Sequence, residues 1–123
     1  LALLAAEVHT IENHAALAEE ARERLARLGY ANAHVHTGAG TLGPPASAPF
    51  DAIIVSAGAP FVPSPLLEQL AEGGRLVIPV GSAEHQELLQ VAKSGAQTST
   101  QHICDCRFVP LVGEHGWPRS HLE

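Results

Sequence analysis

The side chain best placed to do chemistry is the carboxylate of Glu12, at the end of a short stretch with strand character that begins at Val8. Asn13 and His14 follow at once, and either can open a helix by capping its free N–H groups. An acid between a strand and a helix holds the ribose in many α/β folds, because one carboxylate accepts hydrogen bonds from both vicinal hydroxyls. The other interpretation is a surface glutamate stabilised by the dipole of that helix.

A glycine-rich turn, Gly38-Ala39-Gly40, stands at the end of a second short stretch with strand character, Ala33–His36. Glycine lets the chain turn freely and lets a flat ring approach the backbone closely. The turn is therefore a candidate for binding a cofactor. A plain turn after a strand explains the same spacing equally well.

Small residues also end two longer apolar stretches, Ala52–Ser56 and Arg75–Val80. Two all-apolar strands that each run into a Gly/Pro turn are typical of a parallel sheet whose carboxyl edge binds ligands. Ser56 exposes a hydroxyl there, but it lacks the Gly-x-Ser-x-Gly surroundings of a nucleophile elbow, and capping the strand is its simpler role. We predict no catalytic acid, base or nucleophile in this chain.

The eight histidines and two cysteines raise the question of a metal site. His34 and His36 are two apart and face the same side of a strand, and His102 lies near Cys104 and Cys106. None of these groups has a recognisable four-ligand spacing, so we predict no metal. A disulfide across one residue would be strained, and we expect both cysteines to be reduced thiols.

An α/β arrangement must position these groups. Apolar residues at helical spacing predict a helix that ends at Leu28 and is closed by Gly29, and a second helix over Pro65–Ala71 with Ser64 as its cap. The predicted strands are Val8–Ile11, Ala33–His36, Ala52–Ser56, Arg75–Val80, Glu87–Lys93 and Ile103–Val109. The predicted loops are the proline-rich stretch Thr41–Pro49, a hairpin loop over Ser94–Thr100 and an irregular tail from Gly113 to Glu123. We expect residues 1–123 to form a single domain.

Composition excludes several classes of function. The chain has 123 residues, 46% of them apolar, a net charge of −6 and a single lysine, Lys93. A duplex nucleic acid needs clustered positive charge, so it is not an expected partner. No apolar run is long enough to cross a bilayer, and Leu1–Ala6 lacks the basic flank of a signal peptide. We therefore expect a cytoplasmic protein without a membrane partner.

The chain resembles the protein-L-isoaspartate (D-aspartate) O-methyltransferase family, class I enzymes that use S-adenosylmethionine. The resemblance spans nearly the whole chain, in order, and is densest around Phe50. The matching segments are Thr10-Ile11-Glu12, Leu28-Gly29-Tyr30, Gly38-Ala39-Gly40-Thr41-Leu42-Gly43, Ala48-Pro49-Phe50-Asp51-Ala52-Ile53-Ile54-Val55-Ser56-Ala57, Leu67-Glu68-Gln69-Leu70, Gly73 to Gly81 and Phe108-Val109-Pro110-Leu111.

The resemblance implies a protein-repair reaction and a Rossmann-like fold. The family transfers a methyl group to the α-carboxylate of L-isoaspartyl residues in damaged proteins or peptides, which would be the partners. On the cofactor side it implies Glu12 at the ribose, with Asn13 beside it, and Gly38, Ala39 and Gly40 at the adenine. On the substrate side it implies Ser56, Ala57, Val80 and Gly81.

Two departures from the family pattern matter. Ala39 stands where the family has an aspartate that meets the adenine amino group, and the loss of that acceptor costs roughly 1–3 kcal/mol if the amino group stays unpaired. The family's glycine-rich loop and first strand are expected to lie N-terminal to Leu1. We thus expect a partial, mostly parallel sheet that misses its first strand and ends in an antiparallel hairpin. Its two unpaired inner edges would invite self-association, and the 123 residues alone would have weak or no activity.

Two other functions fit parts of the sequence. A degenerate, non-catalytic remnant or protein-binding module of the same fold would explain Ala39 and the expected missing start. A nucleotide-dependent oxidoreductase would use Glu12 on a dinucleotide ribose, but it leaves the matches after Ser56 unexplained.

Overall fold

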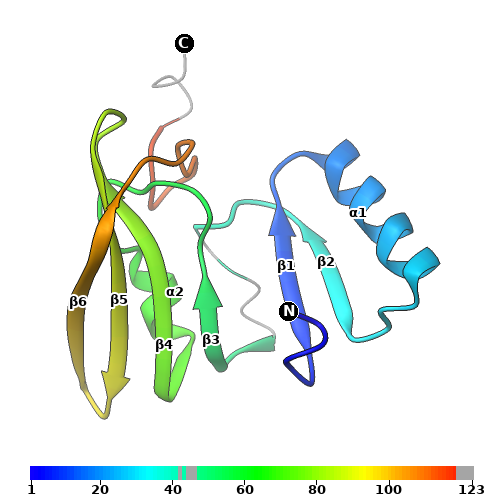
Figure 1. The fold of residues 1–123 in the computed structure, drawn as a ribbon, viewed down its shortest axis with the longest axis horizontal. Coiled ribbons are helices and arrows are strands. Elements are labelled where there is room, and N and C mark those ends of the chain that lie inside the picture. Colours follow the sequence, from blue (N-terminus) through cyan, green and yellow to red (C-terminus); the bar gives the residue numbers. More distant parts are fainter. Residues whose placement is uncertain (42, 44–46, 119–123) are drawn as a thin grey trace. The chain divides into compact units, whose positions relative to one another are not determined.

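The structure is a computed structural model that describes residues 1–41, 43 and 47–118 (Figure 1). The chain divides into two compact units, Leu1–Gly40 and Thr41–Glu123, and each is described by itself. Parts of the predicted proline-rich loop (42 and 44–46) and of the predicted tail (119–123) lie outside the described residues. That the chain forms a single domain stays a prediction.

The first unit is a β-α-β element, as expected. Strand β1 (Val8–Glu12) pairs in parallel with β2 (Ala33–Thr37), and helix α1 (Ala15–Leu28) joins them. Gly29 closes α1 in the left-handed conformation, with φ of 83°, as predicted. His14 takes the N-cap position, but neither predicted capping side chain makes the cap. Instead, Oε1 of Glu12 accepts the His14 N–H at 3.1 Å.

Helix α1 covers one face of this two-stranded sheet (Figure 1). Its Arg22 guanidinium donates to the carbonyl oxygen of Val35 at 3.1 Å and to Oγ1 of Thr37 at 3.4 Å. Because side chains alternate along a strand, the Thr37 side chain lies on the α1 face and those of His34 and His36 lie on the opposite face.

The second unit is built on a four-stranded sheet in the order β3-β4-β5-β6. Its strands are β3 (Phe50–Ile54), β4 (Leu70–Gly81), β5 (Gln86–Ser94) and β6 (Gln97–Cys106). The β3–β4 pair is parallel, and β4–β5 and β5–β6 are antiparallel. The antiparallel part therefore includes β4 as well as the predicted hairpin.

Several predicted boundaries in this unit were wrong. The third strand ends at Ile54 rather than Ser56, and β4 begins at Leu70, so helix α2 (Ser64–Glu68) stops before the predicted Ala71. Pro63, not Ser64, holds the N-cap position of α2, and no side chain caps it. Pro65 does lie in the first helical turn, where its missing N–H is tolerated.

The last strand shows the largest shift. Most of the predicted polar loop Ser94–Thr100 is strand, and the hairpin turns tightly through Gly95-Ala96, with Gly95 at φ of 63°. Every residue of β6 before Cys106 is exposed. An edge strand without a buried face needs no apolar pattern, which explains why the sequence pattern misplaced it.

The core lies in the second unit, where seven apolar side chains pack together: Ala59, Leu66, Leu70, Leu76, Ile78, Val91 and Leu111. The Lys93 ammonium, on β5, donates to the carbonyl oxygens of Leu67 and Leu70 at 3.2 and 3.0 Å and so fastens the end of α2 to the sheet.

The strand pairing agrees with a partial sheet. Among the described residues, β1 pairs only with β2, and β3 pairs along its length only with β4. Within the strands that the structure describes, β1 and β3 therefore each have one edge without a paired strand. Within the described part of the chain, none of the helices has the length and apolar character needed to cross a membrane.

Candidate functional site

Glu12 stands at the carboxyl end of β1, half-buried, directly before α1. One carboxylate oxygen accepts a hydrogen bond from the His14 N–H, and this bond holds the side chain where β1 ends and α1 begins. A carboxylate has about four acceptor sites on its two oxygens. The geometry therefore leaves acceptor capacity on this carboxylate, and its predicted role at a ribose stays a prediction.

The Gly38–Gly40 turn lies directly beside Glu12. Thr37 is the register partner of Glu12, and the Gly38 N–H donates to the Glu12 carbonyl oxygen at 3.0 Å. A Cβ placed on Gly38 would meet no atom within 4 Å, so the space in front of this backbone is open. The structure thus brings Glu12 and Gly38 together, and their predicted role in binding one nucleoside stays a prediction. Asn13 is exposed in the bend between β1 and α1.

In the second unit, the carboxyl ends of β3 and β4 bring the predicted substrate residues to one edge. Ser56 is exposed and Ala57 half-buried, just beyond the end of β3. The chain then crosses to β4, where the N–H of Ala59 donates to the Pro79 carbonyl oxygen and that of Gly81 donates to the Ala59 carbonyl oxygen, both at 2.9 Å. Val80 is paired with Ala59 in this bridge.

Gly81 is required by close packing. A Cβ here would lie 2.3 Å from the His85 carbonyl oxygen, and φ is 151°. Only glycine fits this backbone without moving the turn between β4 and β5. The edge made by Ser56, Ala57, Val80 and Gly81 is therefore held on the β4 side by backbone hydrogen bonds and by a turn that only glycine fits.

Sequence reasoning missed Gln86, which holds this edge in place. Its side chain is 1% exposed, and Nε2 donates to the carbonyl oxygens of Ser82 and Phe108 at 3.1 and 3.2 Å. The Phe108 N–H donates back to Oε1 at 2.8 Å. A Cβ on Gly58 would lie 2.3 Å from Nε2, so the chain after Ser56 packs directly on this amide. The only sequence signal was a polar residue at the start of an apolar strand.

The two cysteines differ in their exposure to solvent. Both are free thiols, with Cys104 exposed and Cys106 half-buried. Burial raises the pKa of the Cys106 thiol, and the neighbouring Cys104 and Asp105 raise it further. Cys106 is therefore in its thiol form at neutral pH and is a poor nucleophile.

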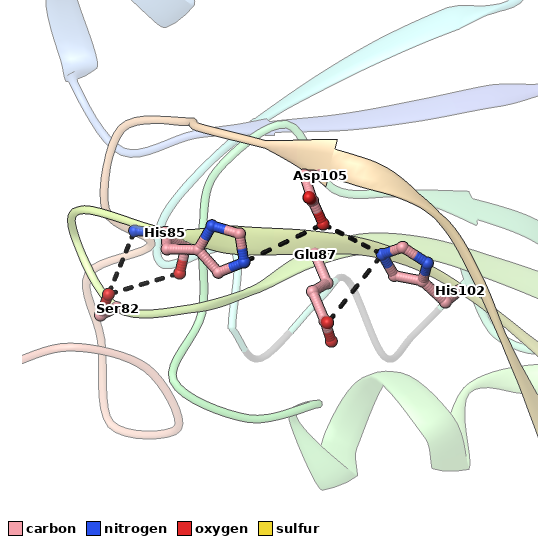
Figure 2. A network of polar contacts seen from close by, with 5 residues as sticks. All are labelled: Ser82, His85, Glu87, His102 and Asp105. Atoms are coloured by element: carbon pink, nitrogen blue, oxygen red, sulfur yellow. Dashed lines mark hydrogen bonds and ion pairs between the residues drawn. The ribbon is translucent and has the colours of Figure 1, made fainter.

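A polar network lies on the exposed face of the β5–β6 hairpin (Figure 2). Asp105 Oδ1 lies between two imidazoles, 3.3 Å from Nε2 of His102 and 3.9 Å from Nε2 of His85, and Glu87 lies 3.9 Å from His102. A bulge between Leu88 and Leu89 in the pairing puts His102 on the same face as Asp105 although they are three apart. All four side chains are exposed, where such pairs contribute little to stability.

Comparison with known proteins gives a consistent result. The family model described as "Protein-L-isoaspartate(D-aspartate) O-methyltransferase (PCMT)" matches residues 3–116. A Roseiflexus castenholzii protein named protein-L-isoaspartate O-methyltransferase is 54% identical over 121 residues, which are 98% of this chain and 56% of that protein. A Pelobacter propionicus protein named protein-L-isoaspartate O-methyltransferase 2 is 53% identical over 112 residues, 89% of this chain and 50% of that protein. The chain thus spans about half the length of the curated relatives it matches.

Solved structures agree with the sequence comparison. A structure named protein-L-isoaspartate O-methyltransferase matches with a TM-score of 0.82 and 28% identity, over 89% of this chain and 35% of its own. A Plasmodium falciparum protein, described as a putative member of the same group in complex with S-adenosyl-L-homocysteine, matches with a TM-score of 0.73 and 25% identity. It aligns with 86% of this chain and 52% of its own. The α/β fold seen here is thus the fold of part of these methyltransferases.

Proposed function

Because this chain belongs to the protein-L-isoaspartate(D-aspartate) O-methyltransferase family, we propose that it forms part of an enzyme that methylates the α-carboxylate of L-isoaspartyl residues in damaged proteins. The observation that carries the proposal is the family match over residues 3–116. The first unit would hold the adenosine of S-adenosylmethionine, and the second would receive the isoaspartyl segment.

The residues of the first unit fit the adenosine. Glu12 is half-buried and keeps acceptor sites beyond its bond to His14, so it can accept both ribose hydroxyls. The open space before Gly38 admits a flat ring. Ala39 offers no acceptor to an adenine amino group through its side chain, so this chain would bind adenine less tightly than a relative with aspartate there.

The residues of the second unit suit a peptide ligand. When bound, S-adenosylmethionine supplies an electrophilic methyl on a sulfonium, so the protein needs no acid or base and contributes mainly position and a dry site. Exposed Ser56 offers a hydroxyl, and the rigid turn at Gly81 offers a backbone that does not yield. Both would orient the attacking carboxylate.

A chimera tests the proposal. The 121 residues of this chain that match the Roseiflexus castenholzii relative would replace their counterparts in that protein, and the product would be assayed with labelled S-adenosylmethionine and an isoaspartyl peptide. We expect methyl transfer to that peptide and none to the matched aspartyl peptide. A folded chimera that methylates neither peptide would contradict the assignment and favour a non-catalytic remnant.

Point variants of the chimera test the site. Glu12→Gln should weaken cofactor binding about 10- to 100-fold, because a charged acceptor becomes a neutral amide. Ala39→Asp should strengthen it about tenfold by restoring an acceptor. Glu23→Gln, on the exposed side of α1, is the matched control and should change neither binding nor rate. Equal effects of the Glu12 and Glu23 variants would remove Glu12 from the site.

A further inference from the structure

Three histidines and a glutamate gather on the face of the β1–β2 sheet that α1 does not cover. His9 and His34 are register partners on the two parallel strands, and His36 follows His34 by two on the same face. Glu7 precedes β1 and is two residues before His9. Neither the fold nor the proposed methyl transfer uses these four side chains.

Their distances show a connected cluster. Nε2 of His34 lies 2.5 Å from Oε2 of Glu7, and the His9 ring stacks on that of His34 with centroids 4.9 Å apart. Nδ1 of His9 meets Nε2 of His36 at 3.0 Å. One ligand atom from each of Glu7, His9 and His34 lies within 4.8 Å of the other two.

We propose that Glu7, His9 and His34 bind one divalent transition-metal ion, of the Zn²⁺ class, on this face of the β1–β2 sheet, and that His36 positions His9. Imidazole nitrogen and carboxylate oxygen bind Zn²⁺ at about 2.0–2.2 Å, which sets neighbouring ligand atoms about 3–3.5 Å apart. The observed separations need only small side-chain rotations. The side chains of Glu7 and His34 are 61% and 44% exposed and are free to make them.

The donor set selects the class of ion. Two imidazoles and one carboxylate favour Zn²⁺, Ni²⁺ or Co²⁺ over Mg²⁺ and Ca²⁺, which prefer oxygen ligands. Three protein ligands leave further positions to water or another donor. His36 Nε2 lies 3.0 Å from Nδ1 of His9 and can therefore orient the His9 ring. At metal sites a second residue commonly orients a ligating histidine, most often a carboxylate or a backbone carbonyl, and here the His36 imidazole would do so.

The hairpin network of Figure 2 provides a matched comparison. There His85, Glu87 and Asp105 also bring ligand atoms within 4.8 Å of one another, but they offer one imidazole and two carboxylates, all exposed. This set is poorer in nitrogen, and its strands place Asp105 between two imidazoles instead of gathering the imidazoles together. We expect it to bind Zn²⁺ more weakly than the first cluster.

Titration of the 123-residue chain with Zn²⁺ by calorimetry, and with Co²⁺ by visible absorption, tests the proposal. We expect one tight Zn²⁺ per chain and a cobalt spectrum of low coordination number. His34→Gln should weaken binding at least 100-fold, Glu7→Gln about 10-fold and His36→Gln about 10-fold. His102→Gln and His85→Gln, in the second cluster, are the controls and should leave the tight site unchanged.

Circular dichroism identifies variants that fail to fold. His34 is on an exposed face, so the His34→Gln chain should keep the helical signal of α1. If His34→Gln fails to fold, Glu7→Gln tests the same site, because Glu7 lies outside the strands. Unchanged Zn²⁺ affinity in folded Glu7→Gln and His34→Gln, or its loss in His102→Gln, would overturn the proposal. Binding of Mg²⁺ as tight as that of Zn²⁺ would do the same.

Discussion

The two units of this chain differ most in what stabilises them. In Thr41–Glu123, seven apolar side chains form a core beneath a four-stranded sheet. In the described residues of Leu1–Gly40, Ala18 is the sole buried apolar side chain, and the unit relies on one helix, a glycine cap and five register pairs. Stability and the proposed cofactor residues are thus found in different parts of the chain. A ligand that binds only the folded first unit raises the stability of that unit by mass action, so binding of the proposed cofactor should stabilise the first unit.

The largest expected difference comes from deleting core volume in each unit. Leu76→Ala, at a fully buried position, should cost about 2–5 kcal/mol because it leaves a cavity. Leu25→Ala, on the half-buried side of α1, should cost about 1 kcal/mol or less, since alanine is the better helix former. Native-state hydrogen exchange would measure both in their own units. Equal losses would show that the units are stabilised alike.

Glycine substitutions should give a smaller difference. Gly81→Ala should cost about 3 kcal/mol, because its Cβ would press on the His85 carbonyl oxygen at a strained φ. Gly29→Ala has the φ strain alone, with open space around it, and should cost about 1 kcal/mol. Urea unfolding followed by circular dichroism gives both values. If Gly29→Ala lowers the free energy of unfolding as much as Gly81→Ala does, close packing does not determine whether these turns accept a side chain.

The smallest expected effect has the opposite sign. Thr41 is fully buried, and its Oγ1 has no hydrogen-bond partner in the part of the chain that the structure describes. Thr41→Val keeps the shape and removes the unpaired hydroxyl, so it should stabilise the second unit by about 1 kcal/mol. Thr10→Val, at the exposed position of β1, is the matched change and should alter stability by less than about 0.5 kcal/mol. A destabilised Thr41→Val would indicate that this hydroxyl is bonded in solution.

Local sequence patterns were sufficient to predict the strands and the helix of the first unit. Helical spacing ending at Leu28, followed by Gly29, located α1 and its cap, and Glu12 was found at the end of its strand. In the second unit the hydrophobic pattern misplaced strand boundaries, because strand pairing sets those boundaries. Glu72 and Gly73 interrupt the apolar run, so the first residues of β4 were not predicted, although Leu70 pairs with Phe50 across an irregular step in register. The exposed β6 was predicted only over its last residues, Ile103–Cys106, because the residues before them are polar.

The site was predictable only where neighbours in sequence act together. Glu12 and the turn at Gly38 were singled out because each follows a strand directly. Gln86 could not be singled out, since the Phe108 backbone that it binds is 22 residues away. His34 and His36 were noticed, but their meeting with His9 depends on the register of two parallel strands, 27 residues apart along the chain.

The attachment of Lys93 to the end of α2 has a practical consequence for labelling. Lys93 is the single lysine of the sequence, and its ammonium is committed to two carbonyl oxygens. Acylating reagents aimed at lysine would neutralise that charge and loosen the helix they were meant to report on. A fluorophore or spin label is better attached through a maleimide to exposed Cys104, on the outermost strand of the sheet.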